Sequence, residues 1–192
     1  MAQKGYIRTF IAIELPPEIK EAMAEVQAEL RKSDADVGWV RPEGVHMTLK
    51  FLGDVEEKKV SELGDALAER LKGETPFILQ AKGIGTFPTP KAPRVVWLGV
   101  EGEVTRLSAL ADKVESVCAG LKFPKEDRPF KAHLTLGRVK SPGGRASLVK
   151  MLENFKDADL GEFKADAISV MKSELQRSGA VYTEMRRIVF AA

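Results

Sequence analysis

The sequence predicts an α+β fold in which two antiparallel sheets line a central cleft and helices cover their outer faces. Three observations predict it: strand-like and helix-like segments alternate, their order repeats in the two halves of the chain, and the tetrapeptide His-x-Thr-Leu occurs at the same place in each half. A chain of 192 residues can bury enough surface to fold without a disulfide or a metal. We therefore expect one domain, residues 1–192, made of two lobes.

The first half of the chain predicts four strands and two helices. Short segments rich in β-branched and aromatic residues indicate strands at 7–15, 38–40, 45–52 and 77–83, the middle two forming a hairpin around Pro42-Glu43-Gly44. Apolar residues at steps of three and four indicate a helix after Pro16-Pro17 and a second one capped by Gly73. Their apolar positions are Ile19, Met23, Val26 and Leu30, then Val60, Leu63, Leu67 and Leu71.

The second half predicts the same alternation. Strands are expected at 94–100, 131–139, 163–175 and 181–190, with a turn at Ser178-Gly179 before the last strand. A third helix carries an apolar side, and a fourth covers 146–155. Prolines in the loop at 85–90 leave no room for a helix, so the glycines around Ile84 do not form a dinucleotide-binding fingerprint.

The two halves agree in spacing to within one residue. His46 lies 38 residues after Arg8, and His133 lies 39 residues after Arg94. Each histidine is followed by a helix and then by a strand that begins with phenylalanine, at Phe77 and at Phe163. This agreement predicts two repeat units, roughly residues 7–85 and 94–171, one for each lobe. Coincidence is the alternative, because strands and helices alternate in many mixed domains.

The two histidines, the only ones in the chain, share one sequence context. Side chains alternate along a strand, so His46 and Thr48 point one way, as do His133 and Thr135. Imidazoles have pKa values near 6.5, so one can accept a proton while its partner donates one. Such a pair on opposite walls of a cleft suits in-line displacement at phosphorus, with threonine hydroxyls binding the non-bridging oxygens.

A structural role and a metal site are the alternatives for these histidines. A single histidine in an apolar strand is more often a hydrogen-bonded core residue than a catalyst. A zinc site would need further ligands, and two histidines without a nearby cysteine or acidic cluster leave the coordination shell short. We therefore expect no metal and no cofactor. Cys118, the single cysteine, lies on the apolar side of the third helix and is expected in the core.

The motifs around the histidines resemble a known family. His46-Met-Thr-Leu-Lys-Phe-Leu-Gly53 and His133-Leu-Thr-Leu-Gly-Arg138 are similar to the two signatures of the 2H phosphoesterase superfamily, and in particular of the RNA 2′,3′-cyclic phosphodiesterases, also called 2′-5′ RNA ligases. The segments at 8–13, 94–98 and 173–182 resemble that family too, so the likeness spans nearly the whole chain. It implies a bilobal fold and metal-independent opening of terminal 2′,3′-cyclic phosphates to 2′-phosphates, with reversible 2′-5′ joining of RNA ends as a further activity.

The resemblance also implies roles for individual residues. His46 would protonate the departing 3′ oxygen as the proton donor, and His133 would activate water as the proton acceptor. Thr48 and Thr135 would hold the phosphate, and Phe51 would form an aromatic wall for the base or ribose. The near symmetry of the two motifs means that the sequence alone does not distinguish the acid from the base.

Two basic residues are further candidates for the phosphate, Arg138 because the resemblance implies it and Lys50 because of its place in the strand. Arg138 would add positive charge, but strict alternation places it on the face opposite His133, so it reaches the cleft only if the strand bulges or ends near Gly137. Lys50 shares the face of His46 by alternation and is expected to approach the phosphate. Either residue could instead be a solvated side chain at a strand end.

Charge and composition suggest the partners. The net charge is +2, yet residues 128–152 hold six basic residues and no acidic one. This basic stretch is either a rim that binds RNA or an incidental cluster. Phe51 and Phe87 are candidates for stacking on an unpaired RNA end, whereas Trp97, between Val96 and Leu98, is expected in the core. Without a long apolar run, the chain is expected to be cytoplasmic. It is also expected to be a monomer.

We therefore predict an enzyme that acts on RNA ends or nucleotides with a 2′,3′-cyclic phosphate. A nucleotide-binding or RNA-end-binding module with little turnover is the alternative from another class. Hydrolysis of a different cyclic phosphate, such as a small metabolite, is the alternative within the enzyme class.

Overall fold

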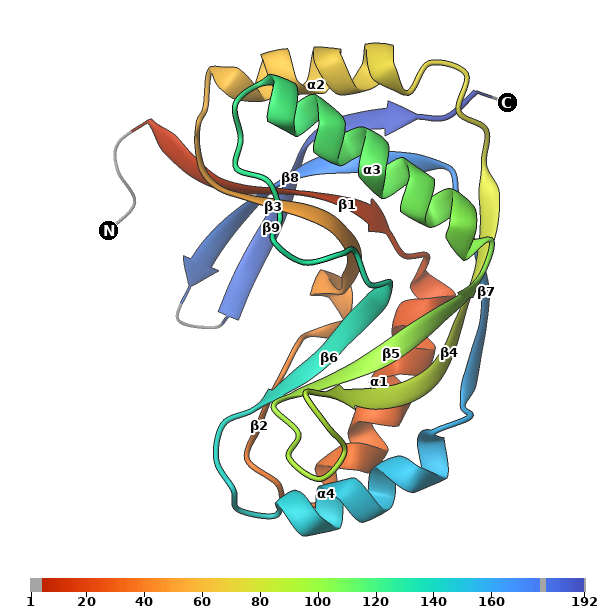
Figure 1. Cartoon of the computed structure of the whole chain (residues 1–192). Coiled ribbons are helices and arrows are strands. Elements are labelled where there is room, and N and C mark those ends of the chain that lie inside the picture. The colour runs from red at the N-terminus through yellow and green to blue at the C-terminus, as the bar shows by residue number, and fades with distance from the viewer. Residues whose placement is uncertain (1–4, 177–178, 192) are drawn as a thin grey trace.

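The computed structural model describes residues 5–176 and 179–191, which form two antiparallel sheets with helices on their outer sides (Figure 1). The first sheet has the order β3-β1-β8-β9 and the second has the order β2-β6-β5-β4-β7. The first contains β1 (Tyr6–Glu14), β3 (His46–Glu56), β8 (Ala167–Gln176) and β9 (Gly179–Val189). The second contains β2 (Val37–Trp39), β4 (Phe77–Phe87), β5 (Val95–Gly102), β6 (His133–Val139) and β7 (Asp159–Ala165). The predicted fold class is confirmed.

Each sheet has two helices on its outer side. Helices α2 (Lys59–Arg70) and α3 (Val104–Gly120) pack on the first sheet, whereas α1 (Pro17–Arg31) packs on the second and α4 (Arg145–Leu152) packs against α1. Two short 3₁₀ turns, Pro42–Gly44 and Glu153–Phe155, complete the order. None of these helices combines the length and the apolar character that crossing a bilayer would require.

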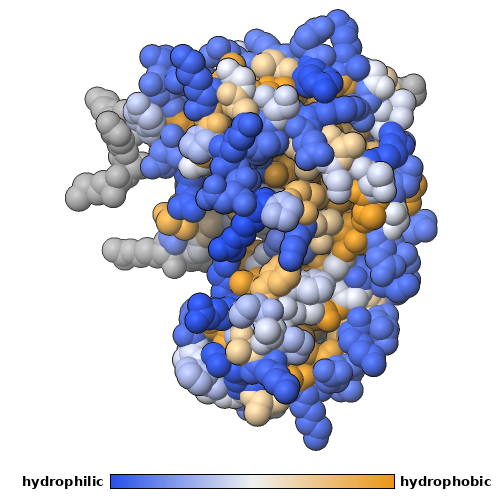
Figure 2. All heavy atoms as spheres, in the orientation of Figure 1, coloured by the Kyte–Doolittle hydropathy of each residue, from blue (hydrophilic) through white to orange (hydrophobic). Residues whose placement is uncertain are grey.

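The outer faces of the sheets build the main core. In the histidine strands, Met47 and Leu49 are buried, as are Leu134 and Leu136, so the predicted division of each motif into a core side and a histidine side is confirmed. Cys118 is fully buried in the same core, and its burial raises the thiol pKa to about 12. Hydrophilic side chains cover most of both lobes, and hydrophobic ones gather at the waist between them (Figure 2).

The sequence repeats and the lobes turn out to be different units. Strand β4 from the first half pairs with β5 in the second sheet, and β8 from the second half pairs with β1 in the first sheet. Helix α1 likewise packs on the second sheet, although it follows a strand of the first. Each lobe is therefore assembled from both halves of the chain.

Three sequence predictions about strands need correction. The predicted hairpin at 38–52 is wrong, because β2 pairs with β6 while β3 pairs with β1, and the 3₁₀ turn carries the chain from one sheet to the other. The segment 163–175 is two strands, interrupted at Asp166. Strand β4 continues beyond residue 83 as far as Phe87. The predicted turn at Ser178-Gly179 involves Ser178, which lies outside the described residues.

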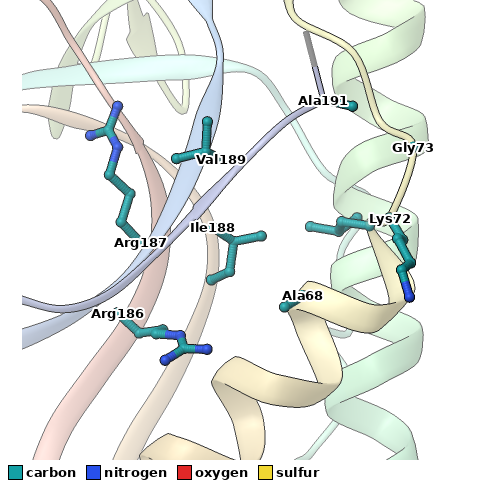
Figure 3. A pocket seen from close by; sticks show the side chains of 9 residues that line it. Ala68, Lys72, Gly73, Arg186, Arg187, Ile188, Val189 and Ala191 are labelled. Atoms are coloured by element: carbon teal, nitrogen blue, oxygen red, sulfur yellow. The ribbon is translucent and has the colours of Figure 1, made fainter.

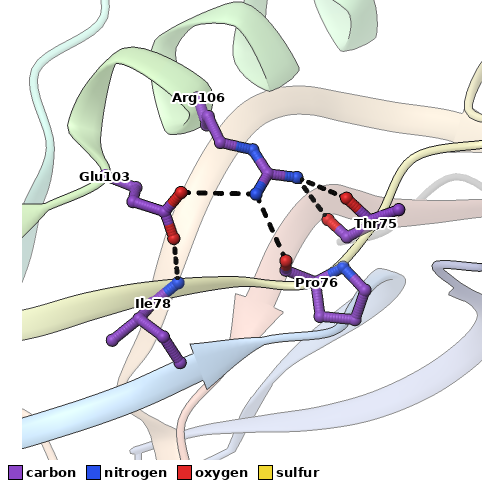
Figure 4. A network of polar contacts seen from close by, with 5 residues as sticks. All are labelled: Thr75, Pro76, Ile78, Glu103 and Arg106. Atoms are coloured by element: carbon purple, nitrogen blue, oxygen red, sulfur yellow. Dashed lines mark hydrogen bonds and ion pairs between the residues drawn. The ribbon is translucent and has the colours of Figure 1, made fainter. Parts of the chain in front are cut away.

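A polar network ties the start of α3 to the segment that enters β4 (Figure 4). Arg106 donates to the carbonyl and hydroxyl oxygens of Thr75 at 2.7 and 2.9 Å and to the carbonyl of Pro76 at 3.2 Å. Glu103 accepts from the Ile78 amide at 2.7 Å, and this bond lowers the pKa of its carboxyl group. The network therefore fixes a connection between the lobes.

Replacing Arg106 by Met should lower the free energy of unfolding by about 1–2 kcal/mol, because three carbonyl and hydroxyl oxygens lose a charged donor. Urea denaturation would measure the change. Lys72→Met, which removes an exposed pair with Glu69 on α2, is the control and should change the free energy by less than about 0.5 kcal/mol. Equal losses in the two variants would contradict a special role of the network.

Candidate active site

His46 begins β3 and lies among aromatic rings. Its ring stacks on Phe10 at a centroid distance of 4.4 Å and an angle of 22°, and the ring of Tyr182 meets it edge-on at 5.0 Å. The Tyr182 ring also lies close to Gly44, where an added Cβ would come within 3.0 Å of a ring carbon. A side chain at Gly44 would therefore displace the ring that covers the histidine.

The aromatic cover shifts the ionisation of His46. Burial lowers its pKa from 6.5 to about 4, a backbone hydrogen bond with Gly44 partly opposes that shift, and the charge of Lys20 adds to it. His46 is consequently neutral at pH 7 in the absence of a ligand. A bound phosphate would supply the negative charge that raises this pKa again.

His133 begins β6 on the second sheet, in a more open environment. Its Nδ1 lies 2.7 Å from the carbonyl oxygen of Lys131. A carbonyl can only accept, so Nδ1 carries the proton and the neutral ring keeps its lone pair on Nε2. Phe87 meets the ring edge-on at 5.4 Å. His133 therefore has the tautomer that a general base needs.

The two threonines lie on the faces of their histidines. Thr48 pairs with Ala12 of β1, which belongs to a small apolar cluster with Phe10 on the face of the first sheet that carries His46. Thr135 pairs with Trp97 of β5, which contacts Phe87 beside His133. Both threonines are half-buried. Their placement is the one that alternation predicts.

Both histidine strands have a β-bulge immediately after the threonine. In β3 the register with β1 passes from Thr48 directly to Lys50, so Leu49 is the extra residue. In β6 the register with β5 passes from Thr135 to Gly137, so Leu136 is the extra residue. An extra residue shifts the alternation by one, so the fifth residue after each histidine returns to the histidine's face.

Phe51 and Arg138 are these two fifth residues. Phe51 pairs with Phe10, and the two rings lie 6.0 Å apart. Arg138 pairs with Val95, the neighbour of Phe87 on the His133 face, so it points toward the space between the sheets, as expected if the strand bulges. The absence of a side chain at Gly137 leaves room for β2, because an added Cβ there would come within 2.7 Å of the Val37 side chain.

Lys50 does not lie where the sequence placed it. The bulge moves it to the outer face of the sheet, opposite Ile11, and its side chain is 1% exposed. Its ammonium group donates to Glu115 of α3 at 2.7 Å and to the carbonyl of Pro124 at 2.8 Å. The expectation that Lys50 approaches the phosphate is therefore wrong, because strict alternation fails at Leu49.

Sequence reasoning missed three residues of this region. Phe10 and Tyr182 enclose His46, and Arg8 lies two residues before Phe10 on the same face of β1. Trp97 is half-buried on the His133 face and covers Gly85, whereas the sequence predicted it in the core. The pairing of β1 with β3 would have indicated Phe10, because it places Phe10 on the same face of the sheet as His46. Tyr182 comes from β9, which is distant in the sequence.

Positive charge gathers around the Tyr182 hydroxyl. Burial raises the pKa of that phenol, and the nearby guanidinium groups of Arg8 and Arg138 oppose the shift. Both arginines are exposed, and within the described parts of the chain neither has a salt-bridge partner. Two free guanidinium groups from different sheets thus lie near the ring that covers His46.

A separate surface pocket lies between the end of α2 and β9 (Figure 3). Its described lining residues include Lys72 and Arg186 but neither a histidine nor a hydroxyl group. Arg186 extends beneath Ile188 toward α2 and pairs with Asp65 at 3.1 Å. This pocket is therefore distinct from the histidine site and lacks its proton-transfer groups.

An α+β fold that presents a matched His-x-Thr motif on each of two sheets defines a two-histidine phosphoesterase. The model of the LigT-like phosphoesterases matches twice, at residues 13–97 and 98–182. The chain belongs to this family, so the resemblance seen in the sequence is confirmed.

Relatives and solved structures agree with this membership. The RNA 2′,3′-cyclic phosphodiesterase of Methanothermobacter thermautotrophicus is 35% identical over 179 residues, 93% of this chain and 96% of the relative. The protein of that name from Aquifex aeolicus is 35% identical over 183 residues, 92% and 94% of the two chains. A crystal structure of a Thermus thermophilus protein matches with a TM-score of 0.80 and 29% identity, covering 96% and 98%. The E. coli LigT complex with 3′-AMP gives 0.77 and 27%, covering 97% and 99%.

The depressed pKa of His46 should make the protein less stable in acid. Above pH 6.5 the imidazole is neutral in both the folded and the unfolded chain, so it has no effect on stability. Between pH 6.5 and about 4 only the unfolded chain binds the proton, and the free energy of unfolding should fall by about 3 kcal/mol in total. Urea denaturation across this pH range should show a smaller loss in His46→Gln than in the wild type.

NMR titration of the imidazole gives an independent measurement. The pKa of His46 should be about 4 in the wild type and should rise toward 6.5 in Tyr182→Ala, which removes part of the aromatic cover. Added inorganic phosphate should also raise it. A His46 pKa near 6.5 in the unliganded wild type would contradict the effect of burial.

Proposed function

We propose that the protein is an RNA 2′,3′-cyclic phosphodiesterase that opens a terminal cyclic phosphate to a 2′-phosphate. The observation that carries the proposal is the pair of matched histidines on two different sheets, one with its tautomer fixed for accepting a proton and the other enclosed by aromatic rings. The names of the relatives at 35% identity support the substrate class.

The reaction begins at His133. Its Nε2 takes a proton from water, and the resulting hydroxide oxygen attacks phosphorus opposite the 3′ oxygen. A new phosphorus–oxygen bond forms while the bond to the 3′ oxygen breaks, which leaves the phosphate on the 2′ oxygen. The hydrogen bond from Nδ1 to the Lys131 carbonyl holds the ring in one orientation and stabilises the imidazolium that forms.

His46 supplies the second proton. It donates to the departing 3′ oxygen, which becomes the 3′ hydroxyl. A histidine with a pKa of about 4 is a strong acid once protonated but carries little proton at neutral pH. The negative charge of the bound phosphate must therefore raise the pKa of His46 so that the imidazole becomes protonated. Substrate binding and protonation of the acid are then coupled.

The remaining residues hold the substrate. Thr48 and Thr135 donate their hydroxyls to non-bridging oxygens from opposite sides, and Arg138 adds positive charge where negative charge develops. Phe51, 58% exposed beside Phe10, offers a face for stacking a base. Attack by an RNA 5′ hydroxyl in place of water would join two ends through a 2′-5′ bond: His133 would take the proton of the 5′ hydroxyl, and His46 would again protonate the departing 3′ oxygen.

Replacing either histidine by alanine should lower kcat by about 10²–10⁴-fold, since each variant lacks one proton-transfer group. The assay measures opening of 2′,3′-cyclic nucleotides and cyclic-phosphate-ended oligonucleotides in the presence of EDTA. Product analysis shows whether the phosphate stays on the 2′ oxygen. Tight binding of these molecules without product at any pH would instead favour a binding module.

Arg8→Gln should distinguish RNA from mononucleotide substrates. Arg8 lies beyond Phe10 on the inner face of β1, where the next phosphate of a strand can reach it. We expect kcat/KM to fall about tenfold for a cyclic-phosphate-ended oligonucleotide, with a shallower salt dependence, and to stay within about twofold for a cyclic mononucleotide. Arg70→Gln, at the end of α2, is the control. Equal losses on both substrates would contradict this role.

A further inference from the structure

A buried lysine lies directly behind the active-site strand β3. Lys50 is 2% exposed, follows Thr48 by two residues, and directs its ammonium group away from the histidines. Its partners are Glu115 Oε2 at 2.7 Å and the Pro124 carbonyl at 2.8 Å. The proposed phosphodiesterase reaction makes no use of this charge.

The partners of Lys50 belong to two other parts of the chain. Glu115 lies on α3, and its Oε1 also accepts from the amide of Glu126 at 3.3 Å. Pro124 and Glu126 lie in the segment 121–132, which leaves α3 on the first lobe and enters β6 on the second. These contacts therefore join β3, α3 and a crossing between the lobes. We call the four residues the Lys50 network: Lys50, Glu115, Pro124 and Glu126.

This crossing leads directly to the second histidine. Segment 121–132 contains no helix or strand, and His133 follows Glu126 by seven residues. His46 precedes Lys50 by four residues. The Lys50 network thus connects the strand that carries His46 to the segment that delivers His133.

Stability alone does not explain a lysine at this place. Removing an ammonium group from water is costly, and replacing a buried ion pair by apolar groups of similar volume is often neutral for folding. Leu49 beside it belongs to the main core, which could accommodate an apolar side chain. What an apolar residue would lose is the directed attachment to Glu115 and Pro124.

We propose that Lys50 is a positioning residue that sets the separation of the two histidines by anchoring segment 121–132 to β3. The effect on catalysis rests on the proposed function, whereas the anchoring does not. A displacement of about 1 Å between acid and base can cost about 10²-fold in rate, so loss of this anchor should affect turnover more than binding.

Lys50→Met, which keeps the length of the apolar stem, tests the proposal. We expect kcat on a 2′,3′-cyclic nucleotide to fall at least tenfold with KM within about threefold, measured well below the melting temperature. Lys50→Arg, which retains a charged donor, should recover part of the loss. Lys113→Met is the matched control. Lys113 lies on α3, the helix that also carries Glu115, and it pairs with Glu74, so kcat should stay within twofold.

Hydrogen exchange of the Glu126 amide gives a readout that needs no turnover. It should accelerate at least tenfold in Lys50→Met and remain unchanged in Lys113→Met. Unchanged exchange, an unchanged kcat, or a rise of KM alone would overturn the proposal. If the wild type shows no turnover, the proposed function fails, and the exchange rates alone decide whether Lys50 anchors the segment.

Discussion

One extra residue in each histidine strand determines what the inner faces of the sheets present. Leu49 and Leu136 interrupt the register immediately after the threonines, and the interruption returns the fifth residue after each histidine to the histidine's face. Without it, Phe51 and Arg138 would point into the main core, where a guanidinium group would lack partners. The same shift moves Lys50 outward. The bulges therefore turn Phe51 and Arg138 to the histidine faces, and the first of them leaves Lys50 on the outer face of its sheet.

The two histidines are equivalent in sequence but not in environment. Phe10 and Tyr182 enclose His46 and lower its pKa to about 4, whereas His133 is held through Nδ1 by a backbone carbonyl. The difference arises from Tyr182 of β9, which lies against His46, whereas Phe87 of β4 is the aromatic ring beside His133. An acid and a base made from one duplicated motif need such an asymmetry, because identical environments would give both groups the same proton affinity.

Periodicity predicted the elements well, since both sheets have one buried face and the helices have apolar sides. It predicted neither which sheet a strand joins nor the bulges: β2 and β3 were expected to pair, and Lys50 was expected beside the phosphate. Strand pairing depends on contacts between distant segments, and a bulge depends on the partner strand. The histidines and threonines could be predicted because they precede the bulge. Tyr182 and Arg8 could not, because Tyr182 comes from β9, which is distant in the sequence, and Arg8 approaches its hydroxyl only through the pairing of β9 with β8 beside β1.

The pairing of β4 and β8 with strands from the other half of the chain explains why a few side-chain contacts can control the alignment of the two lobes. Because β4 pairs with β5 of the second half and β8 pairs with β1 of the first half, each sheet combines strands from both halves, and the chain passes repeatedly between the lobes. Each passage is a covalent restraint on their relative position. Segment 121–132 is a passage without regular structure that enters an active-site strand, so its own backbone hydrogen bonds fix little. Side-chain contacts such as those of Lys50 hold this segment against β3 and α3, and the proposed mechanism, with two opposed histidines, depends on such rigidity.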